Sequence, residues 1–238
     1  MFAGPNGSGK STVKNKVASL NPNWLGVYIN PDEIEESIAE RGFLDLADFR
    51  LKSKAETLFK VLGHSTQLSE KDLLPDLAKL TFSGSKLSFP RNTLNSYFVS
   101  AIADFLHESL AASKTSFAFE TVMSHRRKIE LLKHAKSKTF RNYLYFIATE
   151  APEINISRVK IRVKAGGHGV PEEKIISRYH RSLENLLDAV RATDRAFIFD
   201  NSGAESYLVA EVTDGATVEI MNQNVPIWFA KHFLNKVS

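Results

Sequence analysis

The chain has 238 residues, no cysteine and a formal net charge of +4, with 43% hydrophobic and 24% charged residues. The absence of cysteine excludes disulfides, thiolate catalysis and a cysteine-ligated zinc site, and we expect a reducing, cytoplasmic compartment. The sequence contains no stretch of about twenty apolar residues, so we expect no membrane span. We also expect no secretory signal. The modest positive charge fits an enzyme that binds a polyanionic substrate, so we do not expect a nucleic-acid partner.

The N-terminal residues contain a complete phosphate-binding motif, G-x-x-x-x-G-K-S-T, followed at once by a helix-forming stretch over residues 10–20. In this motif the glycines let backbone N–H groups face phosphate oxygens, the lysine reaches the β- and γ-phosphates, and the serine hydroxyl holds Mg²⁺. The sequence therefore predicts a site for ATP or GTP with Mg²⁺, in which Lys10 is also catalytic and Ser11 is the metal ligand. The predicted nucleotide-binding residues are Gly4, Pro5, Asn6, Gly7, Ser8, Gly9, Lys10, Ser11 and Thr12.

The strand before this motif is expected to be short. A phosphate loop normally follows a buried strand of about five residues, but only residues 1–3 precede Gly4. Either the chain has lost a few residues from its true start, which we favour, or its first strand is a stub. A second strand is expected over residues 27–29, after which Asn30 and Pro31 begin a helix as its cap and first-turn residue. Residues 43–114 exceed a simple crossover in length and are expected to form an inserted helical subdomain.

The rest of the chain predicts strands and helices in alternation. They are strands over residues 116–120, 143–147 and 196–199, and helices over residues 125–138, 152–164 and 171–191. Residues 208–212 and 217–220 flank Thr213-Asp214-Gly215, a pattern typical of a β-hairpin, and residues 226–235 predict a last amphipathic helix. Alternating strands and helices indicate an α/β fold with a parallel sheet between helices. We therefore predict a single P-loop NTPase domain of the nucleoside-kinase type over residues 1–238.

Polar residues that end the predicted strands are candidates for chemistry, because ligands of open α/β sheets bind at the carboxyl ends of the strands. Asp32 follows the second strand, where a carboxylate could bind an attacking hydroxyl and take its proton as general base. Its alternative role is to stabilise a helix dipole from the first turn. Glu120 could orient Mg²⁺ through water or bind a substrate hydroxyl. We interpret Glu150 as a structural acid that caps a helix or faces water.

Two basic helices flank the Gly166-Gly167-His168 turn, an arrangement typical of a closing lid, which we expect over residues 152–191. Arg162 and Arg178 are predicted to neutralise charge on a transferring phosphoryl group, a contribution of roughly 10³-fold where such arginines act. The alternative is a solvated helix face. His168 has no second metal ligand at useful spacing, so we expect it to cap the turn or contact the substrate.

The sequence resembles the zeta-toxin-like kinases, P-loop small-molecule kinases of bacterial toxin–antitoxin modules and their chromosomal relatives. The resemblance extends along the chain except for residues 43–114, and the Gly-Gly-His-x-Val-Pro block is specific to this group. It is carried by residues 2–12, Asn30-Pro31-Asp32, Phe119-Glu120-Thr121, residues 162–171 (Arg-Val-Lys-Ala-Gly-Gly-His-Gly-Val-Pro), residues 178–182 (Arg-Tyr-His-Arg-Ser) and residues 199–202 (Phe-Asp-Asn-Ser).

The resemblance implies ATP- or GTP-dependent phosphorylation of a sugar hydroxyl, as in relatives whose acceptor is UDP-N-acetylglucosamine. It also implies an antitoxin protein as partner, as in the toxin–antitoxin modules. By position, Asp32 matches the catalytic base, Glu120 and Thr121 match an acceptor-binding segment, and Arg162 and Arg178 resemble lid arginines. The insertion follows Asp32 and could reshape the acceptor pocket, so the acceptor stays open. The alternatives are a P-loop ATPase switch, which the lack of a Walker-B Asp-Glu pair disfavours, and a polynucleotide kinase, which the positive charge suggests.

Overall fold

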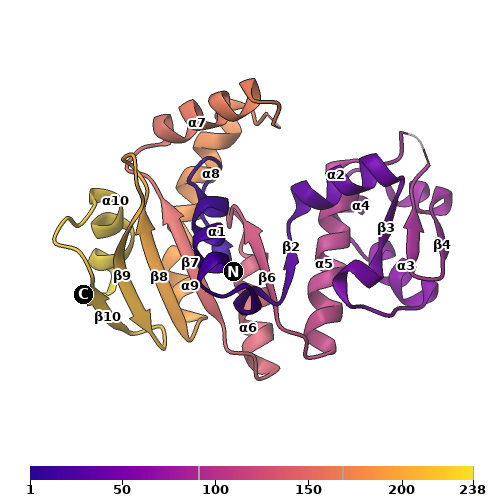
Figure 1. Cartoon of the computed structure of the whole chain (residues 1–238), viewed down its shortest axis with the longest axis horizontal. Coiled ribbons are helices and arrows are strands. Elements are labelled where there is room, and N and C mark those ends of the chain that lie inside the picture. Colours follow the sequence, from indigo (N-terminus) through magenta and orange to yellow (C-terminus); the bar gives the residue numbers. More distant parts are fainter. Residues whose placement is uncertain (91, 168, 238) are drawn as a thin grey trace. The chain divides into compact units, whose positions relative to one another are not determined.

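A computed structural model describes residues 1–90, 92–167 and 169–237 of the chain. These residues form two compact units (Figure 1). The first unit comprises residues 1–24 and 120–238, and the second comprises residues 25–119. Strand β6 (Phe117–Thr121) crosses the boundary, so its first three residues belong to the second unit and its last two to the first.

The first unit is built on a mostly parallel sheet with the strand order β10-β9-β8-β7-β1-β6. Strands β1, β6, β7 and β8 run parallel, and β9 and β10 form an antiparallel hairpin at one edge. The hairpin expected around Thr213-Asp214-Gly215 is therefore present. Besides β6, the strands are β1 (Phe2–Ala3), β7 (Tyr143–Ala148), β8 (Arg195–Asp200), β9 (Tyr207–Thr213) and β10 (Thr217–Ile220).

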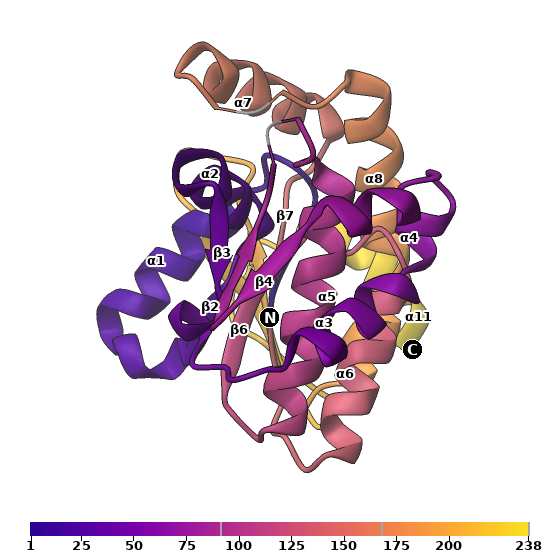
Figure 2. The same cartoon turned by 90° about the vertical axis from the view of Figure 1, so that its right-hand side faces the viewer.

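Helices cover both faces of this sheet, as the alternating pattern predicts. Figure 2 shows α1 on one side of the sheet and α6 on the other. The predicted helix over residues 171–191 is in fact two helices, which are separated by the single residue Asn185. The helices are α1 (Lys10–Leu20), α6 (Arg127–Ser137), α7 (Pro152–Lys164), α8 (Glu172–Glu184), α9 (Leu186–Arg191), α10 (Ile227–Phe229), the π-helical η4 (Ala230–Leu234) and α11 (Asn235–Val237), and the 3₁₀ turn η1 (Pro22–Leu25) leads out of the first part of the unit.

Aromatic packing holds the short strand β1 in the centre of the sheet. The ring of Phe2 stacks on Tyr145 with centroids 4.8 Å apart, and Tyr145 stacks on Phe197 at 5.0 Å. Phe2 itself is buried, and its strand pairs with Glu120 on one side and Tyr145 on the other. Burying a side chain of this size stabilises the fold by about 1.5–3 kcal/mol, so even a two-residue strand fixes the start of the segment that follows it.

The second unit combines the parallel pair β2–β6 with a small antiparallel sheet of order β3-β5-β4. Residues 43–114 thus contain helices, as expected, but also three short strands that the sequence did not predict. Each of these strands has three residues and includes at least one polar residue, so it shows neither an apolar run like that of residues 27–29 nor an alternation long enough to be read. The elements of this unit are β2 (Val27–Ile29), α2 (Pro31–Arg41), β3 (Phe43–Asp45), η2 (Leu46–Phe49), α3 (Ala55–Gly63), α4 (Thr66–Ser69), η3 (Leu74–Lys79), β4 (Thr81–Ser83), β5 (Lys86–Ser88) and α5 (Ser96–Ala112).

Helix α5 forms the core of the second unit, and α2, α3 and α4 all pack against it. The side chain of Asn95 caps its N-terminus by accepting hydrogen bonds from the backbone N–H groups of Tyr97 and Phe98. The helix is buried over most of its circumference, with Phe98, Ile102 and Phe105 at 1% exposure or less. Such an apolar helix needs neighbours on several sides, which explains why the short elements of residues 43–90 collect around it.

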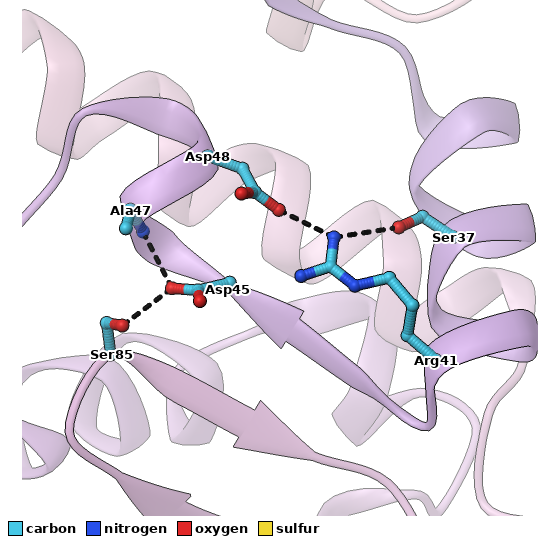
Figure 3. Close-up of polar contacts among 6 residues, drawn as sticks. All are labelled: Ser37, Arg41, Asp45, Ala47, Asp48 and Ser85. Atoms are coloured by element: carbon cyan, nitrogen blue, oxygen red, sulfur yellow. Dashed lines mark hydrogen bonds and ion pairs between the residues drawn. The ribbon is translucent and has the colours of Figure 1, made fainter.

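Polar contacts fix β3 between its neighbours (Figure 3). The carboxylate of Asp45 accepts hydrogen bonds from the backbone N–H of Ala47 at 3.0 Å and from Ser85 Oγ at 2.6 Å, which caps η2 and joins it to the β4–β5 turn. Arg41 at the end of α2 pairs with Asp48 at 2.7 Å. These contacts join α2, β3, η2 and the β4–β5 turn to one another.

No helix among the described residues is long and apolar enough to cross a membrane.

Candidate functional site

The predicted phosphate loop connects β1 to α1 through three glycines in left-handed backbone conformations. Gly7 has a φ of 74° and Gly9, the residue before α1, has a φ of 94°. A side chain at either position would also collide with its neighbour, because a Cβ would lie 2.6 Å from Asn155 O at position 7 and 2.3 Å from Asn201 Nδ2 at position 9. Both positions therefore require glycine for two reasons. Another residue would be strained at the positive φ, and its Cβ would collide with the neighbouring atom.

Two buried asparagines contact the outside of this loop. Asn155 Nδ2 donates to the carbonyl oxygen of Asn6 at 2.6 Å, and Asn201 Nδ2 donates to that of Ser8 at 2.8 Å. The sequence analysis missed Asn155 in α7. The sequence holds one signal for it, because Asn155 lies four positions before the apolar Val159 and so shares its helix face; the structure buries both. A buried amide on an otherwise apolar stripe needs hydrogen-bond partners.

The lysine of the motif lies against its own loop. Lys10 Nζ donates hydrogen bonds to the carbonyl oxygens of Gly4 at 3.0 Å and Pro5 at 2.9 Å. Its ammonium group is therefore held at the start of the loop, and Lys10 is only partly exposed. An ammonium group at a helix N-terminus, next to inward-facing backbone N–H groups, favours an anion in the same place.

Ser11 and Glu120 meet at the first turn of α1. Ser11 Oγ donates to Glu120 Oε2 at 3.0 Å, and the two residues are 109 positions apart in the sequence. The hydroxyl and the carboxylate are hard oxygen ligands of the kind that Mg²⁺ prefers. Among the described residues there is no group of three or more His, Cys, Asp or Glu side chains that could hold a metal alone, so a metal here would take further ligands from water or from a bound phosphate. Thr12, the last residue of the motif, is exposed.

Two polar atoms of the loop have no hydrogen-bond partner among the described residues. They are Asn6 Oδ1 and Ser8 Oγ, and both are buried. Ser8 is 0% exposed. Buried polar atoms are nearly always paired, so an unpaired one in a native site indicates a missing partner. Their place in the loop makes it a candidate site for a ligand or an ordered water that pairs with these atoms.

Thr121, predicted to contact the acceptor, has a structural role at the end of β6. Its Oγ1 accepts a hydrogen bond from the backbone N–H of Met123 at 3.0 Å, and its carbonyl accepts one from Gly4 at 3.2 Å. Met123 has a φ of 55° and its carbonyl is held by Asn185 Nδ2 at 3.0 Å. The left-handed residue and its buried amide partner therefore fix the direction in which the chain leaves Glu120.

The middle of α7 is anchored to the segment that follows β8. Arg158 Nη1 donates to Asn201 O at 2.7 Å and Nη2 donates to Gly203 O at 2.9 Å. Arg162, one turn later, is exposed, and Arg178 on α8 is partly exposed. Arg178 has no hydrogen bond or ion pair to another described residue. His168, predicted to contact the substrate, lies outside the described residues.

A hydrogen-bonded chain joins α8 to the loop. Tyr179 Oη donates to the carbonyl oxygen of Thr149 at 2.7 Å, and the Thr149 hydroxyl donates to Asn155 Oδ1. Burial raises the pKa of Tyr179 well above its ordinary value, and the carboxylates of Glu150 and Asp200 add to the effect. Tyr179 is therefore a neutral donor that orients Thr149.

Glu150 has the structural role that the sequence analysis gave it. Its carboxylate accepts hydrogen bonds from the backbone N–H groups of Ile227 and Trp228, both at 3.2 Å, and so caps α10. Asp200 is buried and accepts hydrogen bonds from Trp228 Nε1 at 2.7 Å and Ser202 Oγ at 2.8 Å. Both acids at these strand ends are thus occupied in holding the C-terminal helices.

Asp32, the predicted general base, belongs to the second unit. It is exposed in the first turn of α2, and its backbone N–H donates to Asn30 Oδ1 at 3.1 Å. The cap and Pro31 at the helix start are those expected from the sequence. The loop, Glu120 and both arginines belong to the first unit, which by itself brings together the loop, Ser11 and Glu120.

No protein-family model matches the chain. An uncharacterized protein of Haemophilus influenzae (strain ATCC 51907 / DSM 11121 / KW20 / Rd) is 38% identical over 63 residues, which is 26% of this chain and 45% of that protein. The chain therefore spans less than half the length of this curated relative.

Three similar solved structures are of the complex between AvrRxo1-ORF1 and AvrRxo1-ORF2. The complex with ATP has a TM-score of 0.59 and 17% identity, covering 100% of this chain and 63% of the other. The complex with sulphate ions (TM-score 0.57, 17% identity) and the native complex (TM-score 0.54, 16% identity) each cover 93% of this chain and 60% of the other. The chain spans less than two thirds of these chains. At this identity the likeness shows the α/β fold, with its mostly parallel sheet flanked by helices.

Proposed function

We propose that the chain is a small-molecule kinase that transfers the γ-phosphate of ATP or GTP to a hydroxyl group. The observation that carries this proposal is the loop between β1 and α1. Lys10, three glycines with positive φ angles and the buried Ser8 Oγ, which has no partner among the described residues, lie there at a helix N-terminus. Oriented backbone N–H groups and an ammonium group together bind a polyphosphate. A similar fold that was crystallised with ATP supports the same ligand.

The donor set at Ser11 and Glu120 fits Mg²⁺, which would supply charge neutralisation between the β- and γ-phosphates. Ser11 would hold it directly, and Glu120 would hold it or orient its water, since their oxygens are 3.0 Å apart. The chain's own residues then position the phosphates. Lys10 shifts from the loop carbonyls to the phosphate oxygens, and Arg162 and Arg178 neutralise charge on the transferring group.

Asp32 is proposed as the general base that binds the acceptor hydroxyl and removes its proton. Its exposed carboxylate at the start of α2 is available for this role. Thr121 and His168 complete the proposed acceptor contacts. The acceptor class that the sequence resemblance favours is a nucleotide sugar such as UDP-N-acetylglucosamine, phosphorylated as by the toxin of a toxin–antitoxin pair. The similar structures are two-protein complexes, which supports a search for an antitoxin partner.

The proposal is tested by incubating the protein with γ-labelled ATP or GTP, Mg²⁺ and a panel of nucleotide sugars, nucleosides and oligonucleotides, followed by mass spectrometry. A small-molecule kinase gives one labelled phosphomonoester whose mass is that of the acceptor plus one phosphoryl group. Labelled oligonucleotide with steep salt dependence would point instead to polynucleotide phosphorylation. Free phosphate alone, with every acceptor, would contradict a kinase.

A further inference from the structure

We propose that Asn155 and Asn201 are positioning residues that hold the loop in its anion-binding shape, an inference that rests on the proposed nucleotide site. Both side chains are buried, at 0% and 9% exposure. They come from separate elements, α7 and the segment after β8, and each donates its amide to one loop carbonyl. The two carbonyls belong to alternate residues of the loop, Asn6 and Ser8.

Each of these hydrogen bonds also fixes an N–H group. A trans peptide is planar, and its C=O and N–H point in opposite directions. The carbonyl of Asn6 shares a peptide with the N–H of Gly7, and the carbonyl of Ser8 shares one with the N–H of Gly9. A carbonyl held outward by an asparagine therefore keeps the N–H of the next residue directed to the other side of the peptide. Two such bonds prevent the loop from turning its carbonyls toward a bound anion.

The asparagines are themselves held in place. Asn155 Oδ1 accepts the hydroxyl of Thr149, so that its Nδ2 must face the loop. Asn201 is fixed through its backbone, because its N–H donates to Ala148 O at 2.8 Å and its carbonyl accepts from Arg158 at 2.7 Å. A group whose own orientation is fixed by packing and hydrogen bonds can hold another group to the accuracy that a binding site needs.

The loop leaves room for both residues. A Cβ at position 7 would lie 2.6 Å from the main-chain oxygen of Asn155, and one at position 9 would lie 2.3 Å from Asn201 Nδ2. Gly7 is thus required by the close main chain of α7, and Gly9 by the Asn201 amide itself, besides the positive φ of each glycine.

The test compares the variants Asn155→Ala and Asn201→Ala with the control Asn142→Ala. Asn142 is also buried, at 7% exposure, and its Nδ2 also donates to main-chain carbonyls, those of Leu132 at 2.7 Å and Ala192 at 3.3 Å. It precedes β7, at the opposite end of the sheet from the loop. The dissociation constant of a non-hydrolysable ATP analogue is measured for each variant by calorimetry, and the melting temperature is measured without nucleotide.

All three variants are expected to melt at lower temperature than the wild type. The two positioning variants are expected to bind the analogue about tenfold more weakly, while Asn142→Ala binds as the wild type does. A fourth variant, Asn155→Asp, keeps the size of the side chain and its acceptor oxygen but lacks the donor. It is expected to lose at least as much affinity as Asn155→Ala. If residue 155 merely filled space, the aspartate would restore the wild-type affinity.

Wild-type affinity in Asn155→Ala and Asn201→Ala, or in Asn155→Asp, would overturn the positioning role while leaving the nucleotide site in place. An equal loss of affinity in Asn142→Ala would also overturn it, because the effect would then come from general destabilisation. A wild-type protein that binds no nucleotide would overturn both this inference and the proposed function.

Discussion

Ser11 Oγ and Glu120 Oε2 lie 3.0 Å apart and join the first turn of α1 to the end of β6. If these oxygens hold or orient Mg²⁺, replacement of the carboxylate should lower the affinity for Mg²⁺ more than the affinity for the nucleotide. We expect Glu120→Gln to raise the Mg²⁺ concentration needed for half-maximal turnover by about 10–100-fold, with nucleotide affinity in the absence of metal unchanged. An unaltered Mg²⁺ titration would assign Glu120 to another role.

Asp32 should separate binding from chemistry. We expect Asp32→Asn to bind nucleotide as the wild type does and to lose about 10²–10⁴-fold in phosphotransfer, the usual contribution of a general base. The control is Glu36→Gln, which neutralises another exposed acid of α2 and should leave turnover unchanged. Single-turnover transfer with a saturating acceptor measures the effect. Full activity of Asp32→Asn would show that Asp32 is not the general base and would leave it only the role of stabilising the helix dipole.

Arg178 is expected to act on the transferring phosphoryl group. The change Arg178→Ala should lower kcat by about a thousandfold and change the KM for nucleotide much less, because the charge that it neutralises develops in the transition state. Arg141→Ala, which removes an exposed arginine before β7, is the matched control. A loss confined to KM would make Arg178 a ground-state binder, and the same comparison applies to Arg162→Ala.

The acid stability of the second unit should depend on Asp45. Hydrogen bonds from Ser85 and from the backbone of Ala47 hold the pKa of this carboxyl below its ordinary value of 3.8. Since the folded-state pKa is lowered, the stabilisation is present above pH 3.8 and is lost as the pH falls through the folded-state value. Asp45→Asn and Ser85→Ala should both flatten this part of the stability curve, measured by urea unfolding against pH. Curves parallel to that of the wild type would show that the contacts contribute nothing.

The sequence predicted the parts of the site that depend on local spacing. The glycines, Lys10 and Ser11 occupy fixed positions in one motif, and the cap at Asn30 is set by its neighbours in the chain. Asn155 could not be assigned in this way, because its partner Asn6 is 149 positions away. The same holds for the contact of Ser11 with Glu120, which arises only when β1 and β6 pair.

The sequence predicted the class of sheet but not the order of its strands. Alternating strands and helices indicate a parallel sheet, but the place of β1 between β6 and β7 depends on tertiary packing, in which Phe2 stacks on Tyr145. The strands β3, β4 and β5 were missed because their three residues include polar ones and so lack the apolar run that marks residues 27–29. Helix α5 is the element that most supports the expected helical character of residues 43–114, because it has 17 residues and ten of them are buried.

The most direct test of the central claim is nucleotide turnover in Lys10→Ala, with Lys16→Ala as the control. Both lysines lie on α1, but only Lys10 contacts the loop, through Gly4 and Pro5, while Lys16 is exposed. The measurement is transfer of labelled γ-phosphate under saturating ATP and Mg²⁺. We predict wild-type turnover in Lys16→Ala and none above background in Lys10→Ala, and wild-type turnover in Lys10→Ala would contradict a phosphotransfer site at this loop.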